Sequence, residues 1–435
     1  MERLRLFRSD ITLMSPSLDD SIGNFVAADG SPTCRDTVRC GGIEVPRYQN
    51  EFWTSRQRQA SSIHEVSYRA CFKPQLPRFF IDLFTRAGDV VYDPFSGRGT
   101  TAIEAALMGR RVIANDINPL SAVLARPRLS PPSLDAVAER LDEIPRVRGG
   151  RAGTDLSMFY HPKTRAEIVA LRRYLRDRGE DEDDADRWIR MVATNRLTGH
   201  SKGFFSVYTL PPNQAVSPES QRRINEKRRQ KPEYRDTHAL ILKKSQQLLT
   251  RISPEEEAAL RCAGTDALFL TGRADETPAI PDASVALTVT SPPFLDIVQY
   301  AKDNWLRCWF NGLDAAEVGA GITTARTVEE WQAVMGRVFA ELFRVTRPGG
   351  RVAFEVGEVR HGRVALDEHV VPLGAGAGFL PEGIMVNSQA FTKTSNIWGI
   401  ANNAGGTNTN RIVLFRKPER GGKSAKKSAV IDPDI

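Results

Sequence analysis

A glycine-rich turn between two short apolar runs restricts the fold of this 435-residue chain more than any other feature of the sequence. The first run covers residues 89–93, the turn Pro94-Phe95-Ser96-Gly97-Arg98-Gly99-Thr100 follows it, and residues 101–107 have a helical pattern. A second apolar run, 111–116, comes next and ends in Asp116. Strand, tight turn, helix and strand in this order are typical of a parallel α/β sheet that binds a nucleotide. The sequence therefore predicts such a sheet, with a ligand site at the turn.

The turn contains the residue types that a nucleotide-like ligand requires. Glycines allow the backbone to turn tightly and to approach a ligand closely, because they have no Cβ. The N-terminus of the following helix offers free N–H groups and a partial positive charge. Asp116 stands where a carboxylate accepts hydrogen bonds from two ribose hydroxyls. We therefore predict that the ligand is bound by Asp93, Pro94, Phe95, Ser96, Gly97, Gly99, Thr100 and Asp116.

The α/β pattern stops after residue 126 and resumes near residue 265. Residues 127–264 are helix-rich, charged and poor in strand signals, so one α/β domain with a large helical insertion fits better than two tandem domains. Strands are predicted again at 267–270, 285–290, 351–356 and 411–415, and an amphipathic helix at 327–345. The expected organisation is an irregular segment over 1–60, an α/β domain formed by 61–126 and 265–416, the insertion 127–264, and a basic, disordered tail over 417–435.

A second motif, Thr290-Ser291-Pro292-Pro293-Phe294, follows the predicted strand 285–290. The two prolines fix φ and remove two backbone donors, so that carbonyl oxygens remain as rigid acceptors. A planar amine fits such a site: Ser291 and the Pro292 carbonyl accept its two N–H bonds, and Phe294 stacks on its ring. An amine held in this way keeps its lone pair for attack on a methyl sulfonium.

Together, the turn 93–101 and the motif 290–294 resemble the amino-group DNA methyltransferases that use S-adenosyl-L-methionine. The Ser-Pro-Pro-Phe form is similar to the branch that methylates cytosine at N4, whereas the N6-adenine branch usually begins this motif with Asp or Asn. The resemblance implies a Rossmann-like α/β fold with a mostly parallel sheet and an antiparallel last strand. It also implies S-adenosyl-L-methionine as the cofactor, and it implies catalytic roles for Ser291, Pro292, Pro293 and Phe294.

Three further segments take part in the resemblance. Residues 68–76 are similar to a family segment that closes over the methionine end of the cofactor, which implies contacts from Phe72 and Lys73. Residues 272–275 are similar to a family segment with an acid near the adenine amine, which implies that Asp275 has this role. Residues 299–307 resemble the stretch that follows the catalytic motif in bacterial enzymes of this branch.

The resemblance covers residues 60–125 and 265–416, and the chain departs from the family pattern in three ways. Arg98 stands where the family often has Ser or Thr. The cofactor motif precedes the catalytic motif, whereas many N4-cytosine enzymes have the reverse order. The insertion falls between the second and third strands, which is not the usual place for a target-recognition domain. Motif order varies in the family by circular permutation, so the last two departures do not prevent the sheet from forming.

The sequence leaves other acceptors of the methyl group open. Adenine N6 is the nearest alternative, and an RNA base or a protein glutamine amide also presents an amine. A nucleic-acid-binding subunit without catalysis is an alternative of another class, and both intact motifs argue against it. Carbon-5 cytosine methylation is disfavoured, because it needs a thiolate nucleophile from a Pro-Cys pair and the chain has no Pro-Cys.

Positive charge is concentrated in two segments. The chain has 60 Lys and Arg against 53 Asp and Glu, a formal net charge of +7. Residues 220–235 and 416–427 each have an excess of five positive charges, so the rest of the chain is close to neutral. A base in a duplex must be flipped out to reach a pocket, and phosphate contacts hold the distorted DNA. We predict that double-stranded DNA is the partner and that the insertion binds it through Arg222, Arg223, Lys227, Arg228 and Arg229.

Composition disfavours several other classes of protein. No apolar run approaches the length of about 18 residues that a membrane span needs, and residues 1–16 lack the apolar core of a secretory signal. The five cysteines are scattered and form no C-x-x-C pair, so neither a disulfide framework nor a zinc site is predicted. A cytoplasmic enzyme that needs no metal is therefore expected, and the resemblance allows a restriction nuclease or a defence system as its partner.

Overall fold

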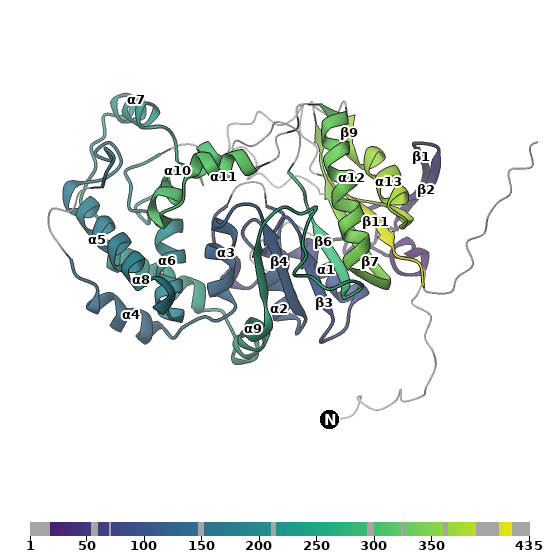
Figure 1. The fold of residues 1–435 in the computed structure, drawn as a ribbon, viewed down its shortest axis with the longest axis horizontal. Coiled ribbons are helices and arrows are strands. Elements are labelled where there is room, and N and C mark those ends of the chain that lie inside the picture. Colours follow the sequence, from purple (N-terminus) through teal and green to yellow (C-terminus); the bar gives the residue numbers. More distant parts are fainter. Residues whose placement is uncertain are drawn as a thin grey trace, which may run out of the picture.

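A nine-stranded mixed sheet forms the centre of the molecule, in the order β1-β2-β10-β11-β7-β6-β3-β4-β5 (Figure 1). The structure is a computed structural model, and it describes residues 18–53, 60–68, 71–146, 152–209, 215–293, 300–322, 325, 327–359, 364–388 and 409–419. The strands of the sheet are β1 Cys34–Cys40, β2 Ile43–Asn50, β3 Val90–Asp93, β4 Arg111–Asp116, β5 Leu268–Thr271, β6 Val285–Thr290, β7 Thr346–Val356, β10 Leu380–Ser388 and β11 Thr409–Arg416. A separate short pair is formed by β8 Glu358–Val359 and β9 Val364–Ala365.

In the half of the sheet with the order β7-β6-β3-β4-β5, each strand is parallel to the next. β3 pairs with β4 and with β6, β4 also pairs with β5, and β6 also pairs with β7. Parallel strands end at the same edge of a sheet, so the segments that follow β3, β4 and β6 come together at the carboxyl edge. Each of the two sequence motifs follows one of these strands. The predicted α/β sheet is confirmed.

The other half of the sheet is mixed. β11 pairs antiparallel with both β7 and β10, which confirms the expected antiparallel last strand. β10 is a strand that the sequence pattern did not predict. Five of its nine residues, from Gly383 to Asn387, are buried, and the strand lies between β11 and β2.

The expectation that residues 1–60 are irregular is wrong for residues 34–50. β1 and β2 form an antiparallel hairpin, and β2 adds to the main sheet in parallel with β10. Gly41 and Gly42 make the turn at φ 56° and 88°, which is a region that favours glycine. β1 is an edge strand with mostly exposed side chains, so its sequence has no apolar face that would reveal a strand.

Helices cover both faces of the sheet. α12 Val328–Val345 and α13 Leu366–Gly376 pack on one face, where Phe339 and Leu342 meet Phe354 of β7. α1 Gln75–Phe84 and α2 Thr100–Leu107 pack on the opposite face. α12 lies within one residue of the helix predicted at 327–345. The remaining helices of this part are α3 Leu120–Ala125, α10 Tyr300–Asn311 and α11 Ala315–Gly321.

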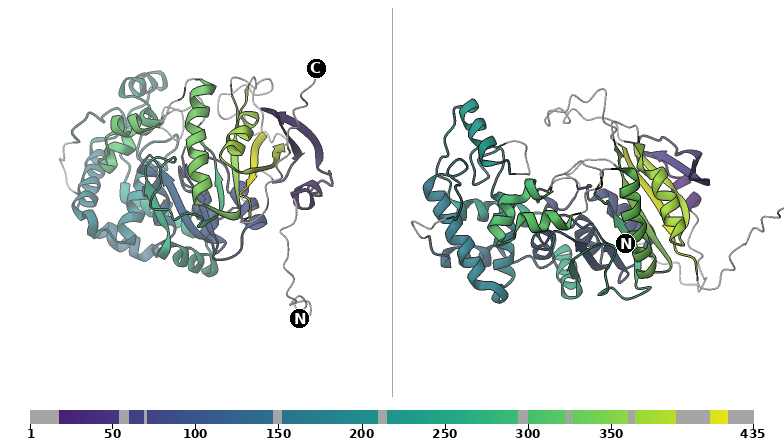
Figure 2. Two further views of the ribbon diagram at one scale, coloured as in Figure 1. Left: turned by 45° about the vertical axis from the view of Figure 1, so that its right-hand side comes forward. Right: turned by 45° about the horizontal axis from the view of Figure 1, so that its top comes forward.

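The insertion is helical, as predicted, and stands beside the β5 edge of the sheet (Figure 1, Figure 2). Its helices are α4 Leu134–Glu143, α5 Pro162–Arg178, α6 Asp184–Arg196, α7 Pro218–Arg228, α8 Thr237–Leu249 and α9 Pro254–Asp266. Trp188 and Ile241 in its centre belong to the same apolar cluster as Phe80 and Ile103 of the α1–α2 layer. The insertion therefore shares a core with the α/β domain. None of the helices that the structure describes is long and apolar enough to span a membrane.

Candidate functional site

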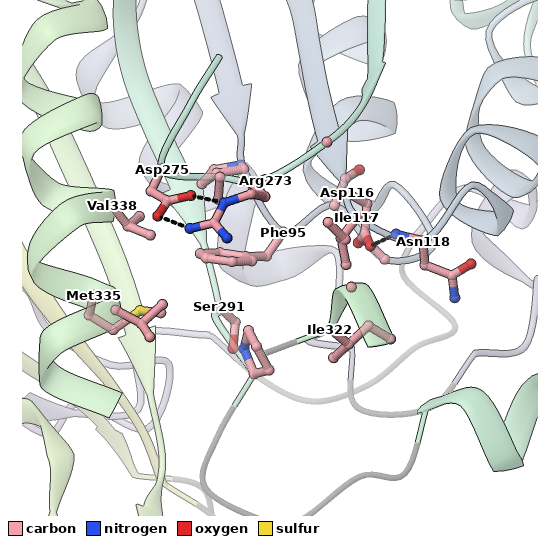
Figure 3. Close-up of a pocket in the computed structure, with 18 of the residues that line it drawn as sticks. Phe95, Asp116, Ile117, Asn118, Arg273, Asp275, Ser291, Ile322, Met335 and Val338 are labelled. Carbon is pink, nitrogen blue, oxygen red and sulfur yellow. Dashed lines mark hydrogen bonds and ion pairs between the residues drawn. The ribbon is translucent and has the colours of Figure 1, made fainter. Parts of the chain in front are cut away.

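A pocket at the carboxyl edge of the parallel strands joins the two sequence motifs. The turn after β3 contributes residues 94–97 and Thr100, the end of β4 contributes Asp116, and the segment after β6 contributes Ser291 and Pro293. Figure 3 shows side chains of α12 on one side of the pocket and residues 116–118 on the other, with Phe95 and Ser291 between them. Phe72 and Asp275 also line it. The structure therefore brings most of the predicted cofactor-binding and catalytic residues into one cavity.

Two glycines give the turn its shape. Gly97 and Gly99 have φ of 53° and 77°, which side chains with a Cβ rarely adopt. A Cβ on Gly97 would meet the Cys71 Sγ at 3.4 Å, and a Cβ on Gly99 would meet the Ala125 Cβ at 2.5 Å. Gly99 is the N-cap of α2 and is not among the residues that line the pocket. Its role is to let α2 pack closely against α3.

Three backbone amides of the turn, those of residues 95–97, are bonded within the protein. Phe95 N donates to Asp93 Oδ1 at 3.1 Å, and Ser96 N donates to the Asn115 carbonyl at 2.9 Å. Gly97 N donates to Asp116 Oδ2 at 2.8 Å. These bonds fix the turn in place, so it offers a ligand its shape and side chains rather than a row of amide donors.

Asp116 has acceptor capacity left for a ligand. Besides Gly97 N, it accepts from Asn118 N at 2.9 Å, and burial raises the pKa of Asp116 to about 6. An ionised carboxylate has about four lone-pair positions, so about two remain for hydroxyl donors. The nearby Ser96 Oγ is buried and has no hydrogen-bond partner in the part of the chain that the structure describes. Both side chains therefore fit a ligand with adjacent hydroxyl groups.

Asp93 connects the two motifs. Thr290, the last residue of β6, donates from Oγ1 to Asp93 Oδ1 at 2.6 Å. Burial raises the pKa of Asp93 to about 7, although hydrogen bonds from Thr290 and Phe95 oppose the shift. Thr101 adds a second link, from its Oγ1 to the Val289 carbonyl at 3.1 Å. Asp93 therefore positions the turn and β6 against each other and does not line the pocket itself.

Asp275 lines the pocket, but its carboxylate is held by two guanidinium groups. Arg273 donates to it at 2.6 and 2.9 Å, and Arg337 of α12 donates at 3.0 Å (Figure 3 shows the Arg273 pair). Hydrogen bonds from both arginines, with that of Arg273 the larger, hold the pKa of Asp275 below its usual range. The predicted adenine contact therefore has Arg273 as a near neighbour, which the sequence pattern did not single out.

Ser291 and Pro293 enter the pocket from β6. The Pro293 carbonyl accepts from Trp331 Nε1 of α12 at 3.0 Å, which fixes the end of the motif against the helix. Glu355, the residue after the β7 partner of Thr290, is buried, and burial raises the pKa of its carboxyl. Pro292 is buried and is not among the lining residues, and Phe294 lies outside the residues that the structure describes.

Arg98, the residue that departs from the family pattern, holds the segment that brings Tyr68 and Phe72 to the pocket. Its Nη1 donates to the carbonyl oxygens of residues 64 and 66 at 3.4 and 2.9 Å, and its Nη2 donates to the Phe72 carbonyl at 3.5 Å. Buried carbonyl groups outside helices and strands need such donors. Arg98 therefore fastens the lining segment to the glycine turn.

The same segment is also fastened to the insertion and to α10. The Ser67 carbonyl accepts from Asn195 Nδ2 of α6 at 2.8 Å and from Arg307 Nη2 of α10 at 3.2 Å. Tyr68, the next residue, accepts from Asn118 Nδ2 at 3.2 Å through its hydroxyl. The pocket wall is thus linked to three parts of the chain that lie far apart in the sequence.

Several pocket residues were missed by the sequence motifs. Trp331, Met335 and Val338 belong to the apolar stripe of α12, which predicted helix–sheet packing but also lines the pocket. Asn118 lines the pocket two residues after Asp116, the acid predicted to bind the ribose hydroxyls. Lys73 was predicted as a cofactor contact but is not among the lining residues, and burial lowers the pKa of its amine. The described residues hold no group of three or more side chains that could bind a metal ion.

The predicted DNA-binding residues lie on and just after α7, away from the pocket. α7 stands at the outer end of the insertion, on the upper side of the molecule where α10 and α11 also lie (Figure 1). The five basic residues 222, 223 and 227–229 are exposed. Arg222 pairs with Asp155 at 3.0 Å, and the Arg228 guanidinium lies over the Tyr208 ring at 3.8 Å. The structure does not bring these residues together with the catalytic motif.

Residues 44–124 match the model of the N6_N4_Mtase family, which is described as DNA methylase. The matched segment contains the glycine turn and Asp116 but not Ser291. The comparisons support the family of amino-group DNA methyltransferases. The family model covers N6 and N4 enzymes together, so it does not distinguish the two target bases.

Two curated relatives match short stretches of the chain. The type II methyltransferase M.MjaII of Methanocaldococcus jannaschii is 33% identical over 76 residues, which is 17% of this chain and 14% of the relative. The type II methyltransferase M.MvaI of Kocuria varians is 37% identical over 67 residues, which is 15% of each. The chain therefore spans about one seventh of the length of these relatives.

Two solved structures illustrate the structural similarity. A Thermus thermophilus protein described as a DNA modification methylase, in complex with S-adenosyl-L-methionine, is 24% identical, with 36% of this chain and 57% of that chain covered and a TM-score of 0.23. The geranyl diphosphate C-methyltransferase of Streptomyces coelicolor is 9% identical, with 79% and 77% covered and a TM-score of 0.31. At these TM-scores the alignments do not transfer residue roles.

Proposed function

We propose that this protein transfers a methyl group from S-adenosyl-L-methionine to the exocyclic N4 amine of a cytosine flipped out of double-stranded DNA. The observation that carries the proposal is the position of Ser291 and Pro293 in the same pocket as the glycine turn and Asp116. The Ser-Pro-Pro-Phe form of the catalytic motif favours cytosine N4 over adenine N6. The family match over residues 44–124 supports DNA as the substrate.

The pocket fits the cofactor in its charge and its free acceptors. Asp116 would accept the ribose hydroxyls, Ser96 Oγ would gain a partner, and Phe72 and Phe95 would line the apolar parts of the molecule. Asp275, with Arg273 beside it, would lie at the adenine. S-adenosyl-L-methionine supplies an activated methyl group on a sulfonium, so the reaction requires no metal.

The catalytic motif would hold the target amine. Ser291 Oγ and the Pro292 carbonyl would accept its two N–H bonds, which leaves the nitrogen lone pair for the methyl group. The Pro293 carbonyl already accepts one hydrogen bond, from Trp331 Nε1. Phe294 would stack on the base. The protein therefore acts by orienting the amine rather than by forming a covalent intermediate with it.

The insertion would bind the DNA backbone through α7. Its exposed basic residues provide the charge that neutralises phosphates, and α7 lies on the side of the molecule where α10 follows the catalytic motif (Figure 1). Basic residues 222, 223 and 227–229 are the contacts that we assign to phosphates. A cognate nuclease or a defence system as a partner of the enzyme is suggested by the family resemblance alone.

Mass spectrometry of nucleosides tests the target base. DNA from a host that expresses the protein, or DNA incubated with the protein and methyl-labelled cofactor, is digested and analysed. We expect label in N4-methylcytosine. Label confined to N6-methyladenine would mean that the same site methylates adenine. Label in RNA but not in DNA would mean that the substrate is RNA. Titration calorimetry with S-adenosyl-L-methionine tests the remaining alternative, because a non-catalytic subunit without cofactor would give no binding heat.

A further inference from the structure

The catalytic motif has few backbone groups with which to hold itself in place. Pro292 and Pro293 lack an N–H, so neither residue can donate to the strand or loop beside it. Only their carbonyl oxygens can be fixed by backbone hydrogen bonding, and each of these needs a donor from another part of the chain. The position of the motif after β6 therefore depends on donors that other elements supply.

Trp331 of α12 supplies such a donor. Its Nε1 donates to the Pro293 carbonyl at 3.0 Å. Only 2% of the surface of Trp331 is exposed, so this hydrogen bond is shielded from water. An indole has a single N–H and no acceptor, which means that the bond to Pro293 uses the whole hydrogen-bonding capacity of the side chain. Trp331 also lines the pocket, beside Ser291 and Pro293.

Helix α12 is a firm support for this contact. Trp331 lies near the start of the helix, and further along the Phe339 ring packs against Phe354 of β7 with 4.8 Å between the ring centroids. Arg337, between them, donates to Asp275 Oδ2 at 3.0 Å. One helix packed on the sheet therefore bonds both to the catalytic motif and to the acid at the predicted adenine end of the pocket.

We propose that Trp331 is a positioning residue for methyl transfer, whose N–H fixes the Pro293 carbonyl and so holds the catalytic motif at the correct distance from the cofactor. The oxygen belongs to the peptide group that leads to Phe294, the residue proposed to stack on the base. Reacting atoms must lie about 3–3.5 Å apart, and a displacement of about 1 Å can slow a reaction about a hundredfold. This inference rests on the proposed function, to which it adds a residue outside both sequence motifs.

This role predicts a change in turnover rather than in cofactor affinity. Figure 3 shows Met335 and Val338 of α12 on one side of the pocket and Asp116 and Asn118 on the other. The proposed ribose contacts therefore lie across the pocket from α12 and do not depend on the indole N–H. Loss of this donor should lower kcat while the Kd for S-adenosyl-L-methionine stays the same, because the motif acts on the target base.

Two substitutions separate the donor from the ring. Trp331→Phe keeps an aromatic ring and removes the N–H, and we expect kcat to fall by about tenfold to a hundredfold. The five-membered ring of histidine matches that of the indole, so Trp331→His can donate from Nε2 at the same position although it removes more volume. We expect its kcat to exceed that of Trp331→Phe by about threefold or more. Transfer of labelled methyl groups to DNA measures kcat at saturating cofactor and DNA, at pH 8, where histidine is neutral.

Trp188→Phe is the matched control. Trp188 of α6 is fully buried in the insertion, and its Nε1 donates to Ser245 Oγ at 2.9 Å. The control therefore loses the same kind of buried hydrogen bond without changing the pocket wall. We expect thermal unfolding to show lower stability for both Phe variants, and kcat to fall only in Trp331→Phe. Titration calorimetry should give the same Kd for S-adenosyl-L-methionine in both variants and in the unaltered protein.

The outcomes separate this inference from the proposed function. A Trp331→Phe variant that folds, binds the cofactor and keeps the kcat of the unaltered protein would overturn the inference and leave the proposed function intact. So would a Trp331→His variant slower than Trp331→Phe, because ring volume would then matter and the donor would not. A loss of cofactor affinity equal to the loss of kcat would make Trp331 a binding contact instead. If the unaltered protein transfers no methyl group to DNA, the proposed function fails, and the inference fails with it.

Discussion

Thr290 and Asp93 end neighbouring parallel strands and share a hydrogen bond of 2.6 Å between the threonine Oγ1 and the carboxylate Oδ1. The residue after Asp93 begins the glycine turn, and the residue after Thr290 is Ser291. One buried hydrogen bond therefore fixes the cofactor side of the pocket against the catalytic side. The hydrogen bond from Thr101 Oγ1 to the Val289 carbonyl is a second link between the two sides.

Thr290→Val is expected to reduce the free energy of unfolding by about 1.5–3 kcal/mol, because it leaves a buried carboxylate without one of its donors. Urea unfolding followed by circular dichroism measures the change. Thr288→Val is the matched control, since Thr288 lies two residues earlier on β6 and its buried Oγ1 has no partner among the described residues. We expect the control to change stability by less than about 0.5 kcal/mol. Equal losses in both variants would mean that the hydrogen bond to Asp93 does not contribute to the free energy of unfolding.

Stability is expected to decrease as the pH rises from about 4 to about 7. Burial raises the pKa of Asp93 to about 7 from an ordinary value of 3.8, so in this range the folded protein binds a proton that the unfolded chain has lost. The free energy of unfolding therefore falls with rising pH in this window. Asp93→Asn removes the titrating group and should flatten the slope of unfolding free energy against pH. An unchanged slope would assign the pH dependence to other groups.

Affinity for S-adenosyl-L-methionine is expected to have the opposite pH dependence. Asp116, with its pKa raised to about 6 by burial, must be ionised to accept two ribose hydroxyls. At pH 5.5 about a quarter of such carboxyl groups are ionised, so the Kd from calorimetry should rise about fourfold relative to pH 8. Asp116→Asn should bind more weakly at pH 8 and show little further change on acidification. A pH-independent Kd in the unaltered protein would argue against this contact.

Arg98→Ser places the residue type common in the family at this position and should weaken cofactor binding by at least about tenfold, because the segment with Tyr68 and Phe72 loses its donors. Titration calorimetry measures the Kd. Arg110→Ser is the control: Arg110 donates to the Thr85 carbonyl at 2.9 Å, away from the pocket, and should lower stability while leaving the Kd unchanged. A similar Kd in both variants would show that the segment keeps its position without Arg98.

Neutralising two exposed residues of α7, Arg223→Gln with Lys227→Gln, should weaken DNA binding and reduce its salt dependence. Each lost phosphate contact lowers the slope of log Kd against log salt by about 0.9, so the pair should lower it by roughly two. The control pair Arg173→Gln and Arg176→Gln removes two exposed charges, both paired with Asp177, from α5. If both pairs change the slope alike, the effect is one of net charge rather than of α7.

The parallel half of the sheet could be predicted from the sequence because its signals are local. Each signal reflects the local structure at its own position: the apolar run before Asp93, the glycines at 97 and 99, and the acid at 116. Helix α12 could be predicted from the spacing of its apolar residues. These features also locate most of the pocket, since parallel strands bring their carboxyl ends together.

Other parts of the site depend on contacts that no local pattern encodes. Arg98 lies in the most recognisable motif, yet its acceptors are carbonyl groups of another segment. Glu355 looks like an isolated charge in a buried strand, and only the register of β6 and β7 shows that it lies beside Ser291. β1 was missed because an exposed edge strand needs no apolar face.

The insertion also has a consequence for the order in which the chain folds. β4 ends at Asp116 and its parallel partner β5 begins at Leu268, so their pairing must close a loop that contains six helices of the insertion. Helical contacts form quickly, whereas distant strand pairing is slow. Helices α4 to α9 should therefore assemble early and bring the two strand ends together, which leaves β5 as the last parallel strand to join. In refolding experiments with hydrogen exchange, amides of β5 should be protected later than those of β3.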